Sequence, residues 1–189
     1  MNRDKIFTAI RTVLPTFTQI QVDSINAILD SCEKHLISDP RFISYILATT
    51  YHETAHTWLP IEEYGKGKGY PYGKKLDIGK GPNKRIAYQT PDKLFYGRGF
   101  VQLTWLSNYM AFARLLKVDL VNRPELALQP DIAAEVLVIG MRDGMFTGHR
   151  LIDSFNKSES DPVEARYIVN GQDKATLIAG YYYKFIKGF

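Results

Sequence analysis

The sequence predicts a mainly α domain with one small insertion of loop or β structure. Apolar residues recur at the spacing of an amphipathic helix in residues 19–36 and 131–146. Between these segments, residues 65–95 lose this periodicity and are rich in Gly, Lys, Tyr and Pro. Hydrophobic residues make up 45% of the chain and charged residues 23%, which is ordinary for a folded globular domain.

The 189 residues are enough to bury one core, and they contain no internal repeat. We therefore expect a single domain over residues 1–189. No apolar run reaches the roughly 18 residues of a membrane-spanning helix, so stable membrane insertion is not expected. The first residues lack the apolar core of a secretory signal, which predicts a protein made in the cytoplasm without a signal peptide.

The first predicted helix covers residues 19–36, with Thr18 as its candidate N-terminal cap. Its apolar stripe includes Cys32, the only cysteine of the chain. One cysteine excludes an internal disulfide and a zinc site built from several cysteines. Its place in the stripe favours a buried structural thiol over a nucleophile.

A second helix is predicted to begin at Asp39-Pro40, because Asp is a good N-terminal cap and Pro fits the first helical position. Its apolar stripe, continued in steps of three and four residues, brings Glu53 and Thr54 onto or beside the buried face. A carboxylate there needs a reason, because an unpaired buried charge is costly. Glu53 either forms a salt bridge, with Arg98 or a loop lysine as its partner, or acts as a catalytic acid.

The Gly- and Lys-rich stretch is predicted to be a loop or loose hairpin, with short strands near residues 70–72 and 85–88. It lacks the G-x-x-x-x-G-K-[ST] spacing of a phosphate-binding loop, which disfavours nucleotide binding. Residues 96–105 form a candidate binding strand. We expect about six to eight helices in all. The later ones are predicted over residues 108–116, 131–146, 162–169 and 174–186.

The net charge of +4 and the pI near 9.0 favour a polyanionic partner. Nucleic acid, an anionic membrane and the bacterial cell wall all qualify, and charge alone does not choose among them. The 12 Tyr residues offer flat rings that suit stacking on sugars or bases. For any one of these rings, burial in or near the core is the commoner role.

Two or three carboxyl groups are candidates for acid and base chemistry. A carboxyl group at the end of an apolar helix, as at Glu53, is partly desolvated, which favours its protonated form and suits a general acid. Glu62 and Glu63 follow about ten residues later. Inverting glycoside hydrolases place two carboxyl groups about 6.5–9.5 Å apart, on opposite sides of the scissile bond. Adjacent glutamates are equally typical of a solvated surface pair.

A competing pattern overlaps the first of these residues. Residues 52–56, His-Glu-Thr-Ala-His, have the HExxH spacing, in which two histidines on one helical face bind zinc. That helix should continue past the second histidine, whereas Pro60 ends this one soon afterwards. A third ligand is also needed, and the only other histidines are His35 and His149. The sequence therefore disfavours a zinc endopeptidase but leaves it as an alternative.

The segment of residues 96–105 combines glycines with polar and aromatic side chains. Gly97 and Gly99 permit unusual backbone angles or the close approach of a ligand. Arg98 is a candidate to hold a catalytic carboxylate, and neutral polar groups beside aromatic rings suit acetamido sugars. The alternative is a structural turn followed by a buried strand. The candidate binding side chains are Tyr96, Gln102, Thr104, Trp105, Asn108 and Tyr109.

Together these segments resemble glycoside hydrolase family 19, which includes chitinases and, closer in size, the endolysins of bacteriophages. The resemblance is carried by ordered motifs that span residues 52–171, most of the chain. These motifs are His52-Glu53-Thr54, Pro60-Ile61-Glu62-Glu63, residues 96–105 with Asn108-Tyr109, and Ile168-Val169-Asn170-Gly171.

The resemblance implies a lysozyme-like helical fold around a substrate groove, and inverting hydrolysis that needs no metal or cofactor. Glu53 matches the family's general acid, and Glu63 matches the base that activates water, with Glu62 as the fallback. Thr104 falls where the family often has a serine that holds this water. Arg98 is expected to organise the carboxylates. The implied substrate-binding residues are His52, Tyr96, Arg98, Gln102, Trp105, Asn108 and Asn170.

Two departures from the plant chitinases point to an endolysin instead. Phe100 stands where the plant enzymes usually have proline, and the disulfides of the secreted enzymes are absent. We therefore expect a monomeric muramidase that acts on cell-wall peptidoglycan, has no nucleic-acid partner, and waits in the host cytoplasm until a holin opens the membrane. The alternatives are a chitinase of the same family, the zinc endopeptidase, and a glycan-binding module without activity. The paired acids argue against the last of these.

Overall fold

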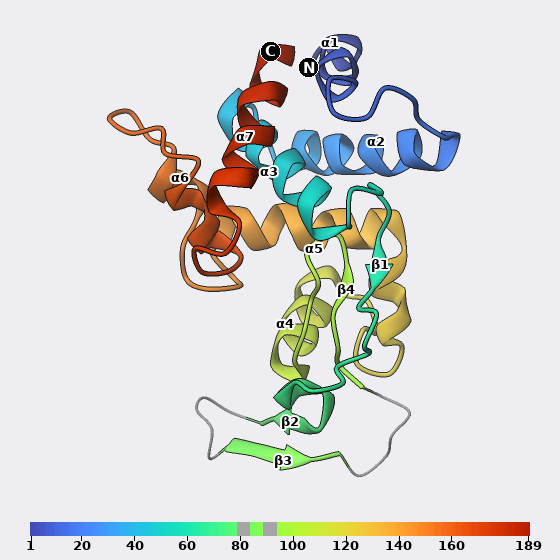
Figure 1. The fold of residues 1–189 in the computed structure, drawn as a ribbon. Coiled ribbons are helices and arrows are strands. Elements are labelled where there is room, and N and C mark those ends of the chain that lie inside the picture. The colour runs from blue at the N-terminus through green and yellow to red at the C-terminus, as the bar shows by residue number, and fades with distance from the viewer. Residues whose placement is uncertain (79–83, 89–93) are drawn as a thin grey trace.

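A computed structural model describes residues 1–78, 84–88 and 94–189. It confirms the mainly α fold, since this part of the chain contains seven α-helices and a few short strands. A helical body holds both chain termini, and a smaller β lobe, the described part of residues 65–95, lies at the opposite end (Figure 1). The helices are α1 (Arg3–Ile10), α2 (Gln19–Lys34), α3 (Pro40–Glu53), α4 (Leu106–Leu116), α5 (Pro130–Asp143), α6 (Leu151–Ser154) and α7 (Ala175–Phe185).

Local signals set the starts of α2 and α3, as predicted. At Thr18, the side-chain hydroxyl accepts from the Gln21 backbone N–H, while the Gln21 side chain accepts from the Thr18 N–H at 2.9 Å. Asp39 Oδ1 accepts from the Arg41 N–H at 2.8 Å. These bonds satisfy N–H groups that have no partner inside a helix. The predicted end at residue 36 is wrong, because α2 ends at Lys34 and Leu36 is 89% exposed.

The core forms where these helices pack together. Helix α2 packs on α5, α3 packs on α7, and α1 contacts the C-terminal turn η5 (Ile186–Gly188). Cys32 is fully buried in this core, as predicted, and burial raises the pKa of its thiol to about 12. None of the described helices is long and apolar enough to cross a lipid bilayer.

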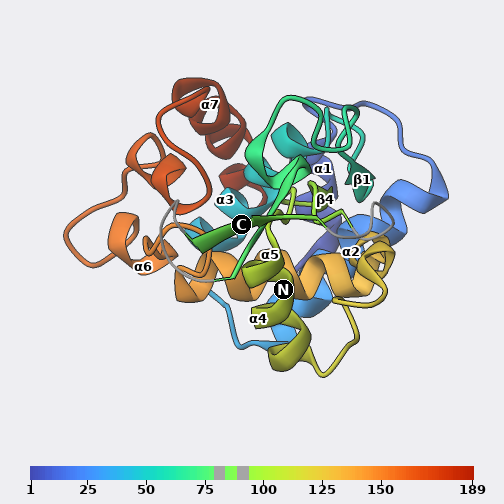
Figure 2. The same cartoon turned by 90° about the horizontal axis from the view of Figure 1, so that it is seen from below.

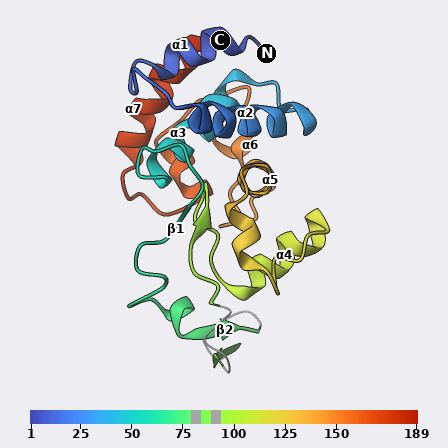
Figure 3. The ribbon, with the colours of Figure 1, turned by 90° about the vertical axis from the view of Figure 1, so that its right-hand side faces the viewer.

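One small antiparallel sheet lies in the β lobe, and a second one lies between this lobe and the helical body (Figure 1). Strand β1 (Ile61–Glu62) pairs with β4 (Arg98–Gly99), and β2 (Lys75–Asp77) pairs with β3 (Arg85–Ala87). Figure 3 shows the β2–β3 sheet at the far end of the molecule from the termini. The strand predicted near residues 85–88 is thus confirmed.

The other predicted strand of the lobe, near residues 70–72, is wrong. The chain there forms a 3₁₀ turn, η1 (Pro71–Gly73), and the strand begins only at Lys75. The cause is a close approach of two glycines: a Cβ on Gly73 would overlap the carbonyl group of Gly67. The loop therefore folds back on itself where extended backbone was expected.

Two later predictions also need correction. In residues 96–105 only Arg98–Gly99 is a strand, because Gly99, Gln102 and Trp105 have φ of 88°, 55° and 69°, which turns the chain repeatedly. The helix predicted over residues 162–169 is a 3₁₀ turn, η4 (Glu164–Ile168). Both irregular segments lie near the end of α3.

Candidate active site

The C-terminal end of α3 lies between two groups of elements. Figures 1 and 2 show α6 and α7 on one side of it, and β1 and β4 on the other. A cavity of about 480 Å³ lies at this place. Its walls contain five of the predicted catalytic and substrate-binding residues: Glu53, Glu63, Gln102, Thr104 and Asn170. The other lining residues are Tyr70, Tyr72, Gly97, Val101 and Val169.

Glu53 is the last residue of α3, and its side chain is 16% exposed. Its Oε1 atom lies 2.6 Å from Nη1 of Arg166, whose side chain is 3% exposed. Arg166 also donates through Nε to the Asp173 carbonyl at 2.9 Å. Among the residues that the structure describes, neither Arg98 nor a loop lysine pairs with Glu53, so the expectation of Arg98 as its partner is wrong. The partner comes from η4, 113 residues away in the sequence.

Arg166 is the main site residue that sequence reasoning missed. It stands in η4 between the fully buried residues Ala165 and Ile168, close to the Asn170 motif. A cation inside such an apolar turn was the available signal, because a buried charge requires a partner. Its partner was not predictable from spacing, because nothing in the local sequence fixes how η4 packs against α3.

We expect Arg166→Gln to lower the free energy of unfolding by about 2–4 kcal/mol, because it leaves the Glu53 carboxylate without its partner in a mostly buried site. Urea denaturation measures this loss. Arg142→Gln is the matched control, since the Arg142–Asp143 pair is 37% and 43% exposed and is expected to contribute about 0–1 kcal/mol. Equal losses in the two variants would show that the Glu53–Arg166 pair has no special stabilising role.

Glu63 faces the same cavity from the other side. Its Oε1 accepts from the Tyr72 hydroxyl at 3.0 Å, and its Oε2 accepts from the Gly97 N–H at 3.1 Å. Burial raises the pKa of Tyr72, and the neighbouring Glu63 raises it further, so the phenol remains a donor. A Cβ on Gly97 would lie 2.7 Å from Oε1 of Gln102, so a larger residue here would displace the Gln102 side chain. Two donors from separate segments therefore fix the orientation of the Glu63 carboxylate.

Glu62 points away from this cavity. Its Oε1 accepts from the Tyr96 hydroxyl at 2.6 Å and lies 3.5 Å from Arg98 Nε, while Oε2 lies 3.4 Å from Lys66 Nζ. The Tyr96 hydrogen bond, followed by the Lys66 and Arg98 charges, lowers the pKa of Glu62 despite an opposing effect of burial. Consecutive side chains of an extended segment point to opposite faces, so Glu62 and Glu63 cannot both line the cavity.

Arg98 is a structural cation of the β1–β4 sheet. Its side chain lies under the Tyr96 ring, 3.7 Å from the ring centre, and Nη1 donates to Tyr109 Oη at 3.1 Å and to the Leu94 carbonyl at 2.9 Å. The expectation that it organises both catalytic candidates is thus corrected: its acidic contact is Glu62. Tyr96 belongs to the same cluster and does not line the cavity.

The other predicted binding residues divide into two groups. Gln102 lines the cavity and is held by donation from Nε2 to the Ile61 carbonyl at 3.1 Å, and Asn170 lines the opposite wall. Asn108 instead donates to the Thr104 carbonyl at 3.0 Å, outside the lining. Trp105 is also outside it, between the Tyr72 ring and the Arg85 guanidinium at 4.3 Å. These two residues support the wall and do not form it.

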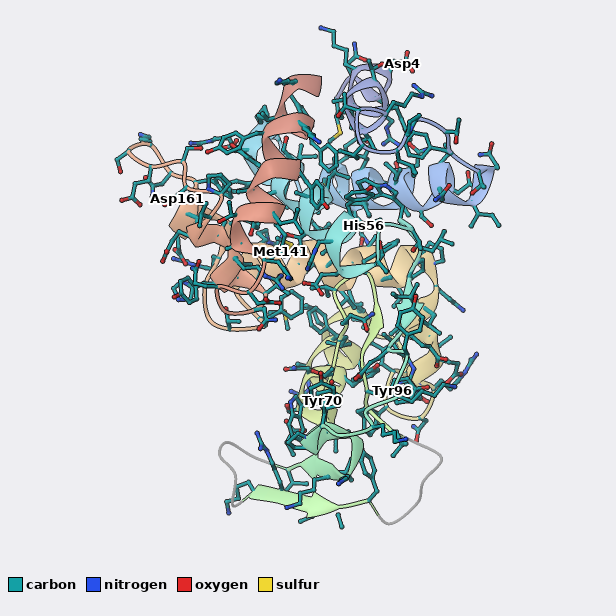
Figure 4. All side chains as sticks on the ribbon, viewed as in Figure 1. Asp4, His56, Tyr70, Tyr96, Met141 and Asp161 are labelled. Atoms are coloured by element: carbon teal, nitrogen blue, oxygen red, sulfur yellow. The ribbon has the colours of Figure 1, made fainter. Side chains whose placement is uncertain are left out.

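Sequence reasoning also missed the two tyrosines of the cavity as site residues. The rings of Tyr70 and Tyr72 stack, with centroids 5.1 Å apart and planes inclined by 6°. Figure 4 marks Tyr70 in the β lobe. Two tyrosines in a loop of Gly and Lys were the available signal, because aromatic rings in such a loop have no helical stripe to occupy.

The geometry required by the HExxH alternative is not formed. Helix α3 ends at Glu53, and the next residues Ala55 and His56 have left-handed φ angles of 51° and 67°. The His56 ring packs on Tyr51 at 4.6 Å, and its Nε2 lies 3.2 Å from the Tyr181 hydroxyl, just past the end of α3 (Figure 4). Two histidines on one helical face are therefore lacking, and residues 1–78, 84–88 and 94–189 contain no cluster of three metal-ligating side chains.

His52 is half-buried beside Glu53 and does not line the cavity. Burial lowers the pKa of His52, although the Glu53 charge opposes this shift. The unfolded chain therefore binds a proton here at higher pH than the folded protein. The stability that neutral His52 contributes is present above the ordinary histidine pKa of about 6.5. It is lost as the pH falls through the lower pKa that His52 has in the folded protein.

We therefore expect the free energy of unfolding to decrease between about pH 7 and pH 5, and His52→Gln to flatten this decrease. Urea titrations of both proteins at several pH values in this window measure the two slopes. Identical slopes would show that His52 does not contribute to the pH dependence.

Comparison with known proteins adds a second line of information. The family model described as chitinase class I matches residues 31–142, more than half of the chain. Endochitinase 1 of Theobroma cacao is 34% identical over 109 residues, which are 49% of this chain and 30% of that protein. Endochitinase 2 of Gossypium hirsutum is 37% identical over 94 residues, 46% of this chain and 30% of that protein. This chain thus spans less than a third of the length of these relatives.

A third relative is named inactive chitinase-like protein 1, from Hevea brasiliensis, and is 33% identical over 88 residues, 46% of this chain and 28% of that protein. Among solved structures, a bacterial family 19 chitinase superposes with a TM-score of 0.70 at 20% identity, covering 96% of this chain and 92% of that one. Chitinase C from Streptomyces griseus HUT6037 gives a TM-score of 0.68 at 20% identity, covering 96% and 75%. At these identities the structures establish a shared fold.

Proposed function

This chain belongs to glycoside hydrolase family 19, and on that premise we propose that it hydrolyses β-1,4 bonds between N-acetylated amino sugars with inversion. One observation carries the proposal: Glu53, at the end of α3, and Glu63, just after β1, line a single cavity. An inverting mechanism needs two carboxyl groups on either side of a bound sugar, with space for a water molecule. Family membership alone does not establish activity, since one relative is named inactive.

In the proposed reaction, protonated Glu53 donates its proton to the glycosidic oxygen as the bond to the anomeric carbon breaks. Arg166, 2.6 Å from Glu53 Oε1, stabilises the carboxylate that this transfer leaves behind. The side chain is thus already oriented by its partner before the sugar binds. No metal or cofactor takes part in this proposal.

Glu63 acts as the general base that removes a proton from the attacking water. The Tyr72 hydroxyl and the Gly97 N–H hold the carboxylate, and Thr104 contributes a hydroxyl group to the same wall. A fixed base and a hydroxyl group beside it can orient one water molecule toward the anomeric carbon. Gln102 and Asn170 offer neutral amide groups that suit the acetamido groups of the sugar.

Peptidoglycan is the proposed substrate, with the chain acting as a monomeric muramidase of the endolysin type after release from the host cytoplasm. The charge of +4 supports an anionic wall polymer over neutral chitin. Chitin is the second candidate, because relatives with 34–37% identity are named endochitinases.

The test is mass spectrometry of the fragments released from purified peptidoglycan and from chitin, with analysis of the new reducing ends. We expect muramic-acid reducing ends from peptidoglycan, at a rate that EDTA does not change. Cleavage of chitin alone would reject the peptidoglycan assignment. Freed peptides whose release stops with EDTA would reject a glycoside hydrolase altogether.

A further inference from the structure

Positive charge is concentrated in one segment of the sequence, residues 65–95. Residues 65–95 contain eight Lys and Arg and two Asp, a net charge of +6, whereas the whole chain carries +4. The rest of the protein is therefore slightly acidic, with a net charge of −2. The positive net charge of this protein therefore comes from this one segment of the sequence.

Within the β lobe, three cations line a pocket of their own. Lys74, Lys75 and Arg85 surround a pocket of about 310 Å³ together with Gly69, Tyr70 and Pro71. The two lysines are exposed, and no acidic side chain in the described part of the chain lies within 4.0 Å of them. The nearby acidic residue of β2, Asp77, accepts hydrogen bonds from the Ser107 backbone N–H at 2.9 Å and from the Ser107 hydroxyl. Both oxygens of its carboxylate thus accept hydrogen bonds from Ser107 of α4.

This pocket adjoins the candidate active-site cavity. Tyr70 lines both, and its ring stacks on Tyr72, whose hydroxyl contacts the proposed base Glu63. Arg85 is a second link between the pocket and the cavity. Its guanidinium lies over the ring of Trp105, and the preceding residue, Thr104, lines the cavity. A glycan that occupies the cavity and continues past Tyr70 therefore brings its substituents to the three cations.

We propose that the Lys74–Lys75–Arg85 pocket binds a carboxylate on the peptide substituent of a peptidoglycan strand that lies in the active-site cavity. This inference rests on the proposed function and specifies its substrate class. A neutral glycan such as chitin has no group for this pocket, whereas each peptide-bearing sugar carries anionic carboxylates. Lys74 and Lys75, which have no acidic partner among the residues that the structure describes, gain from such a ligand, and the Arg85 guanidinium can bind a carboxylate through two hydrogen bonds.

The experiment measures binding and not cleavage, so it does not depend on catalysis. Glu53→Gln protein serves as the starting point, and peptidoglycan strands purified from sacculi and stripped of teichoic acid serve as the ligand. In this background, Lys74→Gln/Lys75→Gln is compared with Lys184→Gln/Lys187→Gln. The two control lysines lie on α7 and η5 and are also exposed, and their replacement removes the same charge.

We expect the Lys74/Lys75 variant to bind strands with a Kd raised roughly three- to tenfold at low salt, and the control variant to change by less than about twofold. Amidation of the strand carboxylates with carbodiimide and ammonia should abolish the difference between the variants. Equal affinities of the two variants for untreated strands would overturn the inference. A difference that survives amidation, or that requires unstripped walls and so follows teichoic phosphate, would also overturn it.

The outcome is separable from that of the proposed function. If the wild-type protein cleaves peptidoglycan and the two variants bind alike, the pocket assignment fails alone. If the wild-type protein cleaves only chitin, the peptidoglycan assignment fails in the cleavage assay.

Discussion

Replacing Glu53 by Gln is expected to lower the rate of glycan hydrolysis by roughly 10²- to 10⁴-fold. The amide is too weak an acid to protonate the glycosidic oxygen, but it has almost the shape of the carboxyl group. Its oxygen can still accept from Arg166, whose Nη1 lies 2.6 Å from Glu53 Oε1. The expected product is therefore a folded protein that binds glycan and hardly cleaves it. Release of reducing ends and a thermal melting curve measure the two properties.

Glu125→Gln is the matched control for this experiment. Glu125 is 59% exposed and pairs with Arg123 at 3.4 Å, in the turn η3 (Pro124–Leu128), which is not part of the cavity. Its loss is expected to leave hydrolysis near the wild-type rate, since isolated surface pairs contribute little. Rapid hydrolysis by folded Glu53→Gln protein would exclude Glu53 as the general acid.

The second large effect is expected from Glu63→Gln, at roughly 10²- to 10⁴-fold slower hydrolysis, because the amide cannot accept a proton from water. Glu62→Gln, one residue away, makes the same chemical change on the opposite face. Its carboxylate contacts Tyr96 at 2.6 Å and Arg98 at 3.5 Å, so we expect a lower melting temperature and a loss of activity of less than about tenfold.

The pair of variants decides which glutamate is the base. Steady-state rates on the same soluble glycan, measured beside the melting temperatures, separate a chemical effect from a loss of folded protein. A larger loss of activity in Glu62→Gln than in Glu63→Gln would reverse the assignment and identify Glu62 as the general base.

Several features of this protein could be predicted because their causes are local. The capping side chains of Thr18 and Asp39 fix where α2 and α3 begin, because each accepts a hydrogen bond from a backbone N–H no more than three residues further along the chain. The 3.6-residue period placed Cys32 in the core and Glu53 at the end of an apolar helix. These features depend on interactions over one or two turns of helix, which the sequence displays directly.

Predictions were less accurate where the backbone is irregular. The expected strand in residues 96–105 is reduced to Arg98–Gly99 because Gln102 and Trp105 adopt left-handed angles without being glycine. Such angles are unfavourable for these residue types and are maintained by packing in the folded protein. Composition gives no sign of them. The strand expected near residues 70–72 was wrong for a similar reason, the contact between Gly67 and Gly73.

The sequence by itself determined the helical class, the family motifs and the candidate carboxyl groups, because each of these is encoded in residues that lie close together along the chain. Only the tertiary structure decided that Arg166 pairs with Glu53 across 113 residues, and that Arg98 pairs with Glu62. It also decided that Glu63 faces the cavity while Glu62 turns away. The physical reason is that an ion pair forms where packing brings two charges within a few ångströms, and that packing is a property of the whole core.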